Sequence, residues 1–216
     1  MMVAVVKRTC MRDRIRDELV ARILDGSYPP GTQLKELSLA REFNVSQAPI
    51  REALRELEGT GLVSSERYRG TWVRGTDLEE MRQSYELRAM MEARSVQRGL
   101  PFSEAIFQQL DLHFTTMTAA AARNDSRDYI DAALAFHRAL VEAGGNATFL
   151  RTWDALHWDV RGRIALQRLF DRGENLAPLL QMHGDLLQKL RAQDVDAACV
   201  MVEAILQQVA QVFSGS

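Results

Sequence analysis

Hydrophobic positions recur at helical spacing through the first sixty residues of the chain. Ile15, Leu19, Ile23 and Leu24 lie on one face of a predicted helix, which Gly26 and the rigid turn "YPPG" end. A shorter apolar pattern in "KELSLAREFNV" predicts a second helix, and "SQAPIREALRELEGTG" predicts a third. The hydrophobic pattern therefore predicts three consecutive helices separated by tight turns.

The third helix has clear start and stop signals. Ser46 suits the N-cap, Pro49 falls in the first turn where no backbone N–H is needed, and Gly59 and Gly61 close the helix. After it the period changes, because "LVSSERYRGTWVR" reads as two short strands around a polar turn. The N-terminal part therefore ends in a predicted hairpin.

From residue 77 onward nearly all of the chain follows a helical pattern. The predicted helices are 77–99, 103–123, 126–143, 146–171, 175–192 and 194–213. Short loops between them favour antiparallel neighbours. We therefore predict a mainly α protein with an N-terminal domain at residues 1–75 and an antiparallel six-helix bundle at residues 76–216.

Composition narrows the class of protein. With 216 residues, 46% of them hydrophobic and 26% charged, the chain can bury a core and is not disordered. No apolar run is long enough to span a membrane and no signal peptide is recognisable, so we expect a cytoplasmic protein with no membrane partner. The two cysteines, Cys10 and Cys199, are isolated, as reduced thiols are.

Lys and Arg outnumber Asp and Glu in residues 1–75, and the reverse holds in the remaining residues. This distribution of charge favours a polyanionic partner for the N-terminal part.

Helix, helix, turn, helix and hairpin is the order of a winged helix-turn-helix. Such a fold places the N-terminal end of its third helix in the DNA major groove, where Gln47 and Arg51 share a face at i, i+4. The hairpin turn "RYRG" would then form the wing. The candidate DNA-binding residues are Lys35, Ser46, Gln47, Arg51, Arg55, Arg67, Arg69 and Gly70. The alternative is a winged helix that binds proteins and never touches DNA.

Residues 10–75 resemble the N-terminal domain of the GntR family of bacterial transcription regulators. The resemblance rests on "ILDGSYPPGTQLKE", "LAREFNVSQAPIREALRELEGTGLV" and "RYRGTWV" in that order. The helical remainder resembles the FadR-like (FCD) subgroup, and six helices instead of seven point to its shorter, VanR-like branch. The resemblance implies a homodimer that binds palindromic operator DNA and changes its grip when a small metabolite binds the C-terminal bundle.

Two positions depart from the family pattern. Many members carry Arg at the position of Gln47 and another at that of Leu37, whereas Arg51 is retained. The family's operator sequence therefore does not carry over to this chain. Because the geometry of a glutamine amide favours adenine, we expect a different base preference at Gln47.

A divalent metal site is the first candidate chemistry in the bundle. In the resembling subgroup an Asp and three His hold a metal; His137 and His183 match two of these positions, but Ala133 and Ile205 occupy the others. A zinc-like ion needs three or four protein ligands. We therefore expect no resident cofactor and expect both histidines to line a metal-free effector pocket. A regulator with a degenerate metal site is the alternative.

Two arginines indicate the kind of effector. Arg88 lies one turn from Glu92, and the resemblance puts its side chain in the cavity, where it could bind a carboxylate; a structural ion pair with Glu92 is the alternative. Arg161 follows two tryptophans on a later helix and is a second candidate, with a solvated surface residue as its alternative. Arg88, His137, Arg161 and His183 are thus the candidate effector-binding residues, for an organic acid. Methionines at 90, 91, 117, 182 and 201 would suit an acyl compound instead.

No pattern in the chain indicates catalysis. A Gly-rich phosphate loop, G-x-S-x-G, H-E-x-x-H and C-x-x-C are all missing from the sequence. An all-helical metal hydrolase is the remaining enzymatic alternative, and it lacks ligands. We therefore predict a DNA-binding transcription regulator and not an enzyme. A dimer that covers a promoter needs no further surface to repress, so a repressor is favoured.

Overall fold

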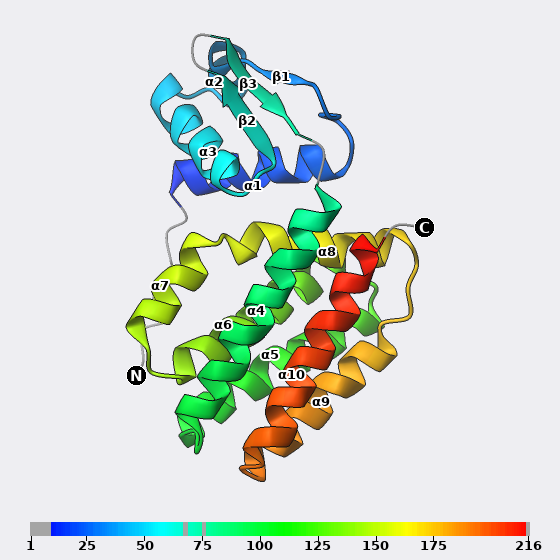
Figure 1. Cartoon of the computed structure of the whole chain (residues 1–216). Coiled ribbons are helices and arrows are strands. Elements are labelled where there is room, and N and C mark those ends of the chain that lie inside the picture. The colour runs from blue at the N-terminus through cyan, green and yellow to red at the C-terminus, as the bar shows by residue number, and fades with distance from the viewer. Residues whose placement is uncertain (1–9, 67–68, 75–76, 215–216) are drawn as a thin grey trace, which may run out of the picture. The chain divides into compact units, whose positions relative to one another are not determined.

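The computed structural model describes residues 10–66, 69–74 and 77–214 (Figure 1). The chain divides into two compact units, Met1–Thr76 and Asp77–Ser216. Each unit has its own hydrophobic core.

Three helices form the body of the N-terminal unit: α1 (Met11–Leu24), α2 (Glu36–Glu42) and α3 (Gln47–Gly59). Helices α1 and α3 pack together through Ile15, Leu19, Ile50 and Leu57, which are all fully buried. The predicted order of helices is confirmed. Ser46 occupies the N-cap position of α3 as predicted, although its side chain makes no capping hydrogen bond with the described residues.

A small antiparallel sheet completes the N-terminal unit. The predicted hairpin consists of β2 (Val63–Glu66) and β3 (Gly70–Val73), and the sheet order is β1-β3-β2. Strand β1 (Gln33–Leu34) was not predicted, because two residues are too short to show a period of two. It pairs with β3 through Gln33 opposite Trp72 and thereby ties the loop before α2 to the hairpin.

The described part of the C-terminal unit contains seven helices instead of the predicted six. They are α4 (Leu78–Gly99), α5 (Glu104–Ala122), α6 (Ser126–Ala143), α7 (Ala147–Ala155), α8 (Trp158–Asp171), α9 (Ala177–Arg191) and α10 (Val195–Ala210), followed by the short η1 (Gln211–Phe213). The predicted helix 146–171 is two helices, since His157 adopts a left-handed conformation with φ of 52° between α7 and α8. Its sequence carries no Gly or Pro at the break. The count that favoured the VanR-like branch is therefore wrong, and the branch itself stays a prediction.

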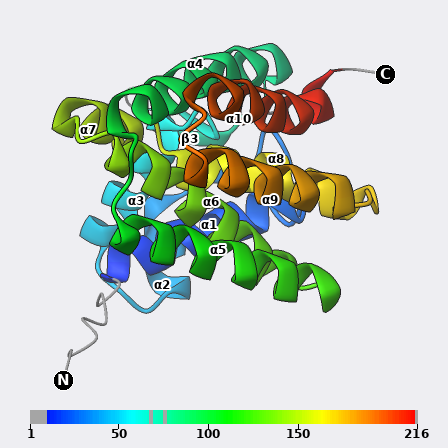
Figure 2. The same ribbon diagram turned by 90° about the horizontal axis from the view of Figure 1, so that it is seen from below.

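The seven helices pack as a bundle with α4 and α10 side by side (Figures 1 and 2). Helix α6 contacts α4, α5 and α8, and α9 contacts α5 and α10. At Gly144, after α6, an added Cβ would lie 2.8 Å from the Cα of Ser95 on α4, so a glycine is needed for this close approach. The bundle brings α4, α6 and α9 around one buried centre, which holds the candidate effector residues.

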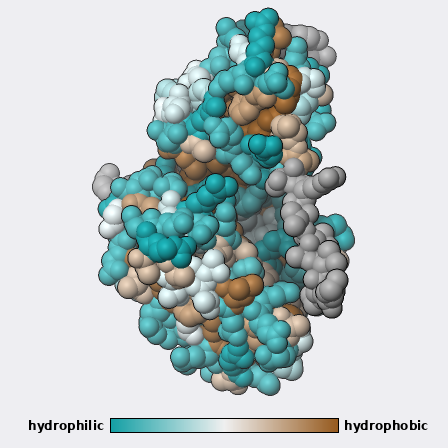
Figure 3. Space-filling model, turned by 180° about the vertical axis from the view of Figure 1, so that it is seen from behind, coloured by the Kyte–Doolittle hydropathy of each residue, from teal (hydrophilic) through white to brown (hydrophobic). Residues whose placement is uncertain are grey.

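One segment, Val195–Phe213, is long and apolar enough to cross a membrane by length and composition. In the fold it is α10 with η1, and its residues Ala198, Val202 and Ile205 are fully buried against the bundle. One face of α10 therefore belongs to the core of the bundle. In the view of Figure 3, polar residues cover most of the described surface and hydrophobic residues form separate patches.

Candidate functional site

The first candidate site is the exposed face of α3. Ile50 and Leu54 face the core, and this orientation leaves Gln47, Arg51 and Arg55 exposed at successive turns. The side chain of Arg55 has no ion pair or hydrogen bond with the described parts of the chain. Ser46 is exposed and its hydroxyl makes no cap bond, so it is available to a ligand at the helix N-terminus. This end of α3 thus offers long hydrogen-bond donors and free backbone N–H groups.

Arg51 is held in place by α2. Its Nη2 lies 2.8 Å from Oε2 of Glu36 and its Nε is 3.2 Å from both carboxylate oxygens, in an exposed ion pair. The guanidinium is therefore oriented but not buried. Lys35 is exposed beside this pair, and Leu37 is also exposed, with 51% of its surface accessible. An apolar side chain thus stands where many family members carry an Arg.

The turn of the hairpin is the second part of this surface. Arg69 is exposed and pairs with Glu66 within the turn. Gly70 has φ of 122°, which an L side chain rarely adopts, and its added Cβ would lie 2.9 Å from Nε2 of Gln33. Gln33 itself donates to the carbonyl of Arg69 over 3.1 Å, so β1 shapes the turn. Arg67 lies outside the described residues.

The second candidate site is a chain of buried polar groups in the C-terminal bundle. On α4, Nε of Arg88 donates to Oε1 of Glu92 over 2.8 Å. The other carboxylate oxygen of Glu92 is 2.5 Å from Nδ1 of His137 on α6. Nε2 of His137 is 3.2 Å from Nε2 of His183 on α9, and Nδ1 of His183 is 2.7 Å from the carbonyl of Leu179. The fold therefore links three of the four predicted effector residues through Glu92.

The contact with a backbone carbonyl fixes the tautomer of His183. The carbonyl of Leu179 only accepts, so His183 carries hydrogen on Nδ1, and its Nε2 is an acceptor when the ring is neutral. By the same argument the Glu92 carboxylate accepts from Nδ1 of His137. When both rings are neutral, the Nε2 atoms of His137 and His183 therefore face each other as acceptors at 3.2 Å.

Burial governs the ionisation of these groups. It lowers the pKa of His183 to about 3 and also lowers the pKa of His137, which the neighbouring Glu92 carboxylate counteracts. Burial alone would raise the pKa of Glu92, but His137 and Arg88 outweigh it and hold that pKa below its ordinary value. Burial therefore favours the neutral form of both imidazoles.

The residues present do not fit a divalent metal. Two imidazole nitrogens converge, whereas a zinc-like ion requires three or four ligands. In residues 10–66, 69–74 and 77–214, no three His, Cys, Asp or Glu side chains are arranged to hold one. Ala133 lies on the wall of the cavity beside His137, and Ile205 is buried apolar core, so neither missing ligand is replaced. Glu92 is already bonded to His137 and Arg88.

Aromatic rings surround the Arg88 guanidinium. Its Cζ lies 5.4 Å from the ring centroid of Tyr85, 5.1 Å from that of Trp153 and 5.2 Å from that of Trp158. Such cation–π contacts stabilise a desolvated cation. The fold therefore keeps a positive charge in the bundle interior even though only one carboxylate touches it directly.

A small cavity adjoins this cluster, with a volume of about 10 Å³. Its wall contains Arg88, His137 and His183 together with Tyr85 and Tyr129. Within the described residues, the hydroxyls of both tyrosines and Nε1 of Trp158 are buried without a hydrogen-bond partner. Unpaired buried donors cost free energy, which makes them candidates to bind a ligand. Apolar wall residues are Ala133, Leu134, Leu166, Leu206 and Val209, so the methionines expected to line an acyl site are not among them.

Arg161 lies apart from this cavity. Its Nη2 pairs with Glu80 over 3.1 Å and its Nη1 donates to Ser84 over 3.1 Å, both on the first turns of α4. The residue is 8% exposed, so the interpretation as a solvated surface residue is wrong. Its Nε has no partner among the described groups. The contacts of Arg161 connect α8 to α4 and do not reach the His137–His183 pair.

Sequence reasoning missed the tyrosines and treated Glu92 only as a partner of Arg88. Tyr85 lies one turn before Arg88 on α4, so the i, i+3, i+7 spacing of Tyr85, Arg88 and Glu92 could have indicated a shared face. Nothing in the local pattern places Tyr129 on the same cavity, because its contacts depend on how α6 packs against α8.

Comparison with known proteins identifies both units. The family model described as "Bacterial regulatory proteins, gntR family" matches residues 11–73, and the model described as "FCD domain" matches residues 83–208. The matched ranges contain the α1–α3 and hairpin region and nearly all of α4–α10.

Curated relatives and solved structures agree with these matches. The chain is 30% identical to a "Probable D-xylose utilization operon transcriptional repressor" of Paenarthrobacter nicotinovorans, over 80% of this chain and 78% of the relative. It is 25% identical to the "Gluconate operon transcriptional repressor" of Bacillus subtilis (strain 168), over 90% and 80% respectively. The structure titled "E. coli McbR/YncC" shares the fold with a TM-score of 0.73, at 21% identity over 95% of this chain and 97% of that one.

Proposed function

The chain belongs to the gntR family of bacterial regulatory proteins and carries an FCD domain, and from this premise we propose a repressor whose grip on operator DNA is controlled by a small organic acid. It is a DNA-binding transcription regulator and not an enzyme, since its domains and its relatives are regulators. The proposal assigns DNA binding to residues 1–75 and effector binding with dimerisation to residues 76–216. Such a regulator acts in the cytoplasm.

The observation that carries DNA binding is the exposed N-terminal face of α3. A helix that enters the major groove presents its first turns to base edges, and Gln47 and Arg51 occupy those turns. Lys35, Ser46 and Arg55 would contact phosphates around the groove, which fix position without reading sequence. Arg67, Arg69 and Gly70 would form the wing. Two such heads, related by a two-fold axis, would bind a palindromic operator.

Replacement of Arg51 tests this assignment. A duplex selected from a random pool by the wild-type protein serves as the probe in a gel-shift titration. We expect Arg51→Ala to lose specific binding, while Arg127→Ala, which removes an exposed Arg of α6 in the other unit, binds as the wild type does. Equal affinity of Arg51→Ala and wild type for the selected duplex would refute the assignment of α3 as the reading helix.

The observation that carries effector binding is the convergence of one buried cation and unpaired hydroxyls. Arg88, Tyr85 and Tyr129 face one cavity beside His137 and His183, and a carboxylate would accept hydrogen bonds from such donors. The positive charge selects for an anion. Arg161 is a candidate only if ligand binding rearranges α8, because its present partners are Glu80 and Ser84.

The size of the cavity supports a coupling between binding and shape. About 10 Å³ holds a single water molecule, so any metabolite must push the walls apart. A ligand that binds only the opened bundle shifts the population of the two states by its differential affinity. In a dimer this shift would change the separation of the two DNA-binding heads.

A thermal-shift series with sodium salts of small carboxylic acids, with and without EDTA, tests effector binding. A ligand that binds only the folded chain raises its melting temperature by mass action. We expect at least one carboxylate to do so equally in both conditions, and its amide analogue to do nothing. If EDTA lowers the melting temperature of the protein in the absence of any carboxylic acid, the protein binds a metal. The degenerate metal site then replaces the metal-free effector pocket as the interpretation.

A further inference from the structure

The outward face of α4 has an unusual order of side chains. Met90 has 68% of its surface exposed, and Gln83, Glu86, Arg94 and Gln97 are exposed on the same side of the helix. At 100° per residue, these four residues lie within about 40° of Met90 around the helix axis. They form one stripe that runs along most of α4, which we call the Met90 face.

The Met90 face is symmetric about its centre. Glu86 is four residues before Met90 and Arg94 is four residues after it; Gln83 and Gln97 are seven residues before and after. Two copies of α4 that cross antiparallel at Met90 would therefore set Glu86 against Arg94, and Gln83 against Gln97, on both sides. A parallel crossing would instead oppose like charges. The charge pattern thus complements itself in one orientation only.

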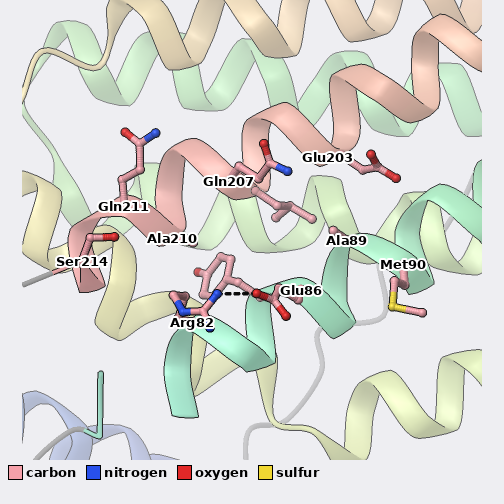
Figure 4. Close-up of a pocket in the computed structure, with 11 residues that line it drawn as sticks. Arg82, Glu86, Ala89, Met90, Glu203, Gln207, Ala210, Gln211 and Ser214 are labelled. Carbon is pink, nitrogen blue, oxygen red and sulfur yellow. Dashed lines mark hydrogen bonds and ion pairs between the residues drawn. The ribbon is translucent and has the colours of Figure 1, made fainter. Parts of the chain in front are cut away.

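A groove with a volume of about 440 Å³ lies beside this face, between α4 and α10 (Figure 4). Met90 and Glu203 lie at one end of it, and Gln211 and Ser214 at the other. Ala89, Met90, Leu206 and Ala210 give the groove an apolar lining. On α10, Val200 is 66% exposed, which extends the apolar surface. Apolar side chains of a partner could enter this groove.

We propose that the Met90 face of α4 is the interface between two copies of this chain, crossing antiparallel on a two-fold axis at Met90. This inference rests on the proposed function, because a palindromic operator requires two DNA-binding units. It adds the surface through which the two copies contact each other. The two-fold axis makes the contact isologous, so each Glu86–Arg94 pair occurs twice. A helix of 22 residues is about 33 Å long, which is enough for a contact of ordinary interface size when the groove is also filled.

Charge reversal tests the pairing directly. Sedimentation equilibrium of the full chain, without DNA, would give the monomer–dimer dissociation constant. We expect Glu86→Arg and Arg94→Glu each to raise it at least tenfold, and the double variant to return it to within threefold of the wild type. Glu174→Arg, an exposed reversal in the loop before α9, is the matched control and should change nothing.

A crosslink tests the position of the axis. Cys10 is exposed and Cys199 is buried, so a Cys10→Ser background removes the reactive native thiol. In that background Met90→Cys should form a disulfide-linked dimer on mild oxidation, since the axis places residue 90 beside itself, whereas Gln97→Cys should not. The interface is refuted by a monomeric wild type, by reversals without effect, or by a double variant no better than the worse single one. A dimer that survives both single reversals would leave the DNA-binding assignment intact.

Discussion

Arg88 and Glu92 lie one turn apart on α4 and form an ion pair in the centre of the C-terminal bundle. The Arg88 Nε is 2.8 Å from Glu92 Oε1, and the glutamate has no exposed surface. Since the second oxygen of Glu92 binds His137, one carboxylate connects α4 to α6. Desolvation makes such a pair costly to assemble, but removal of one partner is costlier still, because the other charge is left buried and unpaired.

Loss of the Glu92 charge should therefore destabilise the bundle. We expect Glu92→Gln to lower the free energy of unfolding by about 3–5 kcal/mol, which urea titration followed by circular dichroism would measure. Glu142→Gln is the control, because Glu142 pairs with Arg138 at the same i, i+4 spacing but at the surface. That change should cost less than about 1 kcal/mol. Similar effects of the two substitutions would show that the buried hydrogen bonds of Glu92 contribute no more to stability than a surface ion pair.

Acid should destabilise the protein through His183. Its pKa is about 3 in the folded chain and about 6.5 in an unfolded one, so between these values the unfolded state binds more protons. The free energy of unfolding should then fall as the pH drops from about 6.5 toward 3, by up to about 1.4 kcal/mol per pH unit. The lowered pKa of Glu92 acts in the same direction below about pH 4.3.

Urea unfolding at a series of pH values would measure this dependence. The His183→Gln variant lacks the titrating ring, so its stability should depend less steeply on pH between 6.5 and 4.5. His157→Gln replaces an imidazole outside the cluster and is the control. If the free energy of unfolding of the wild type and of His183→Gln depended on pH in the same way, His183 would not be the group responsible.

The secondary structure was predictable from the sequence wherever hydrophobic residues repeat at a regular spacing. The helical period placed α1–α6, and the switch to a strand pattern after Gly61 placed the hairpin. The boundary between α7 and α8 was missed because no Gly or Pro marks it, and His157 adopts the left-handed conformation there. Strand β1 was missed because a pair of residues carries no period.

The site was predictable only in part for a similar reason. Arg88, His137 and His183 stood out because polar residues on apolar helix faces must find partners. Which partners they find depends on how α4, α6 and α9 meet, and this register is a tertiary property. The sequence therefore indicated a polar centre but gave neither the bond from Glu92 to His137 nor the separate location of Arg161.

Gly162 on α8 should be necessary for the cavity to keep its shape. A Cβ at this position would lie 2.4 Å from Cδ2 of Leu134 and 3.4 Å from Nη1 of Arg88. We expect Gly162→Ala to cost about 1–3 kcal/mol from overpacking, despite the better helix propensity of alanine. In Gly184→Ala the nearest atom is 3.3 Å away, so that helical glycine is the control. A stabilised Gly162→Ala protein in thermal unfolding would contradict this packing.

Glu36 should restrain DNA binding through Arg51. The carboxylate neutralises the Arg51 guanidinium and would sit near DNA phosphates. We expect Glu36→Gln to raise affinity for random-sequence duplex DNA and to steepen its dependence on salt by about one unit of slope. Fluorescence anisotropy at several salt concentrations would measure both. Glu66→Gln frees Arg69 in the wing and provides a comparison, since its effect should be confined to the contacts of the wing.

Gln47 should set the base preference that distinguishes this regulator from relatives with Arg at the same place. Gln47 is exposed on the first turn of α3, where the amide matches the N6 and N7 atoms of adenine and a guanidinium matches O6 and N7 of guanine. Selection from a random duplex pool should therefore give adenine at one symmetric pair of positions for the wild type and guanine for Gln47→Arg. Each exchange should be worth about 1–3 kcal/mol in competition binding. Because Arg55 lies two turns further along α3, Arg55→Gln should weaken binding to all duplexes without changing the selected base. Identical selected sequences for the wild type and Gln47→Arg would mean that Gln47 does not reach the base edges, and that α3 enters the groove by another face.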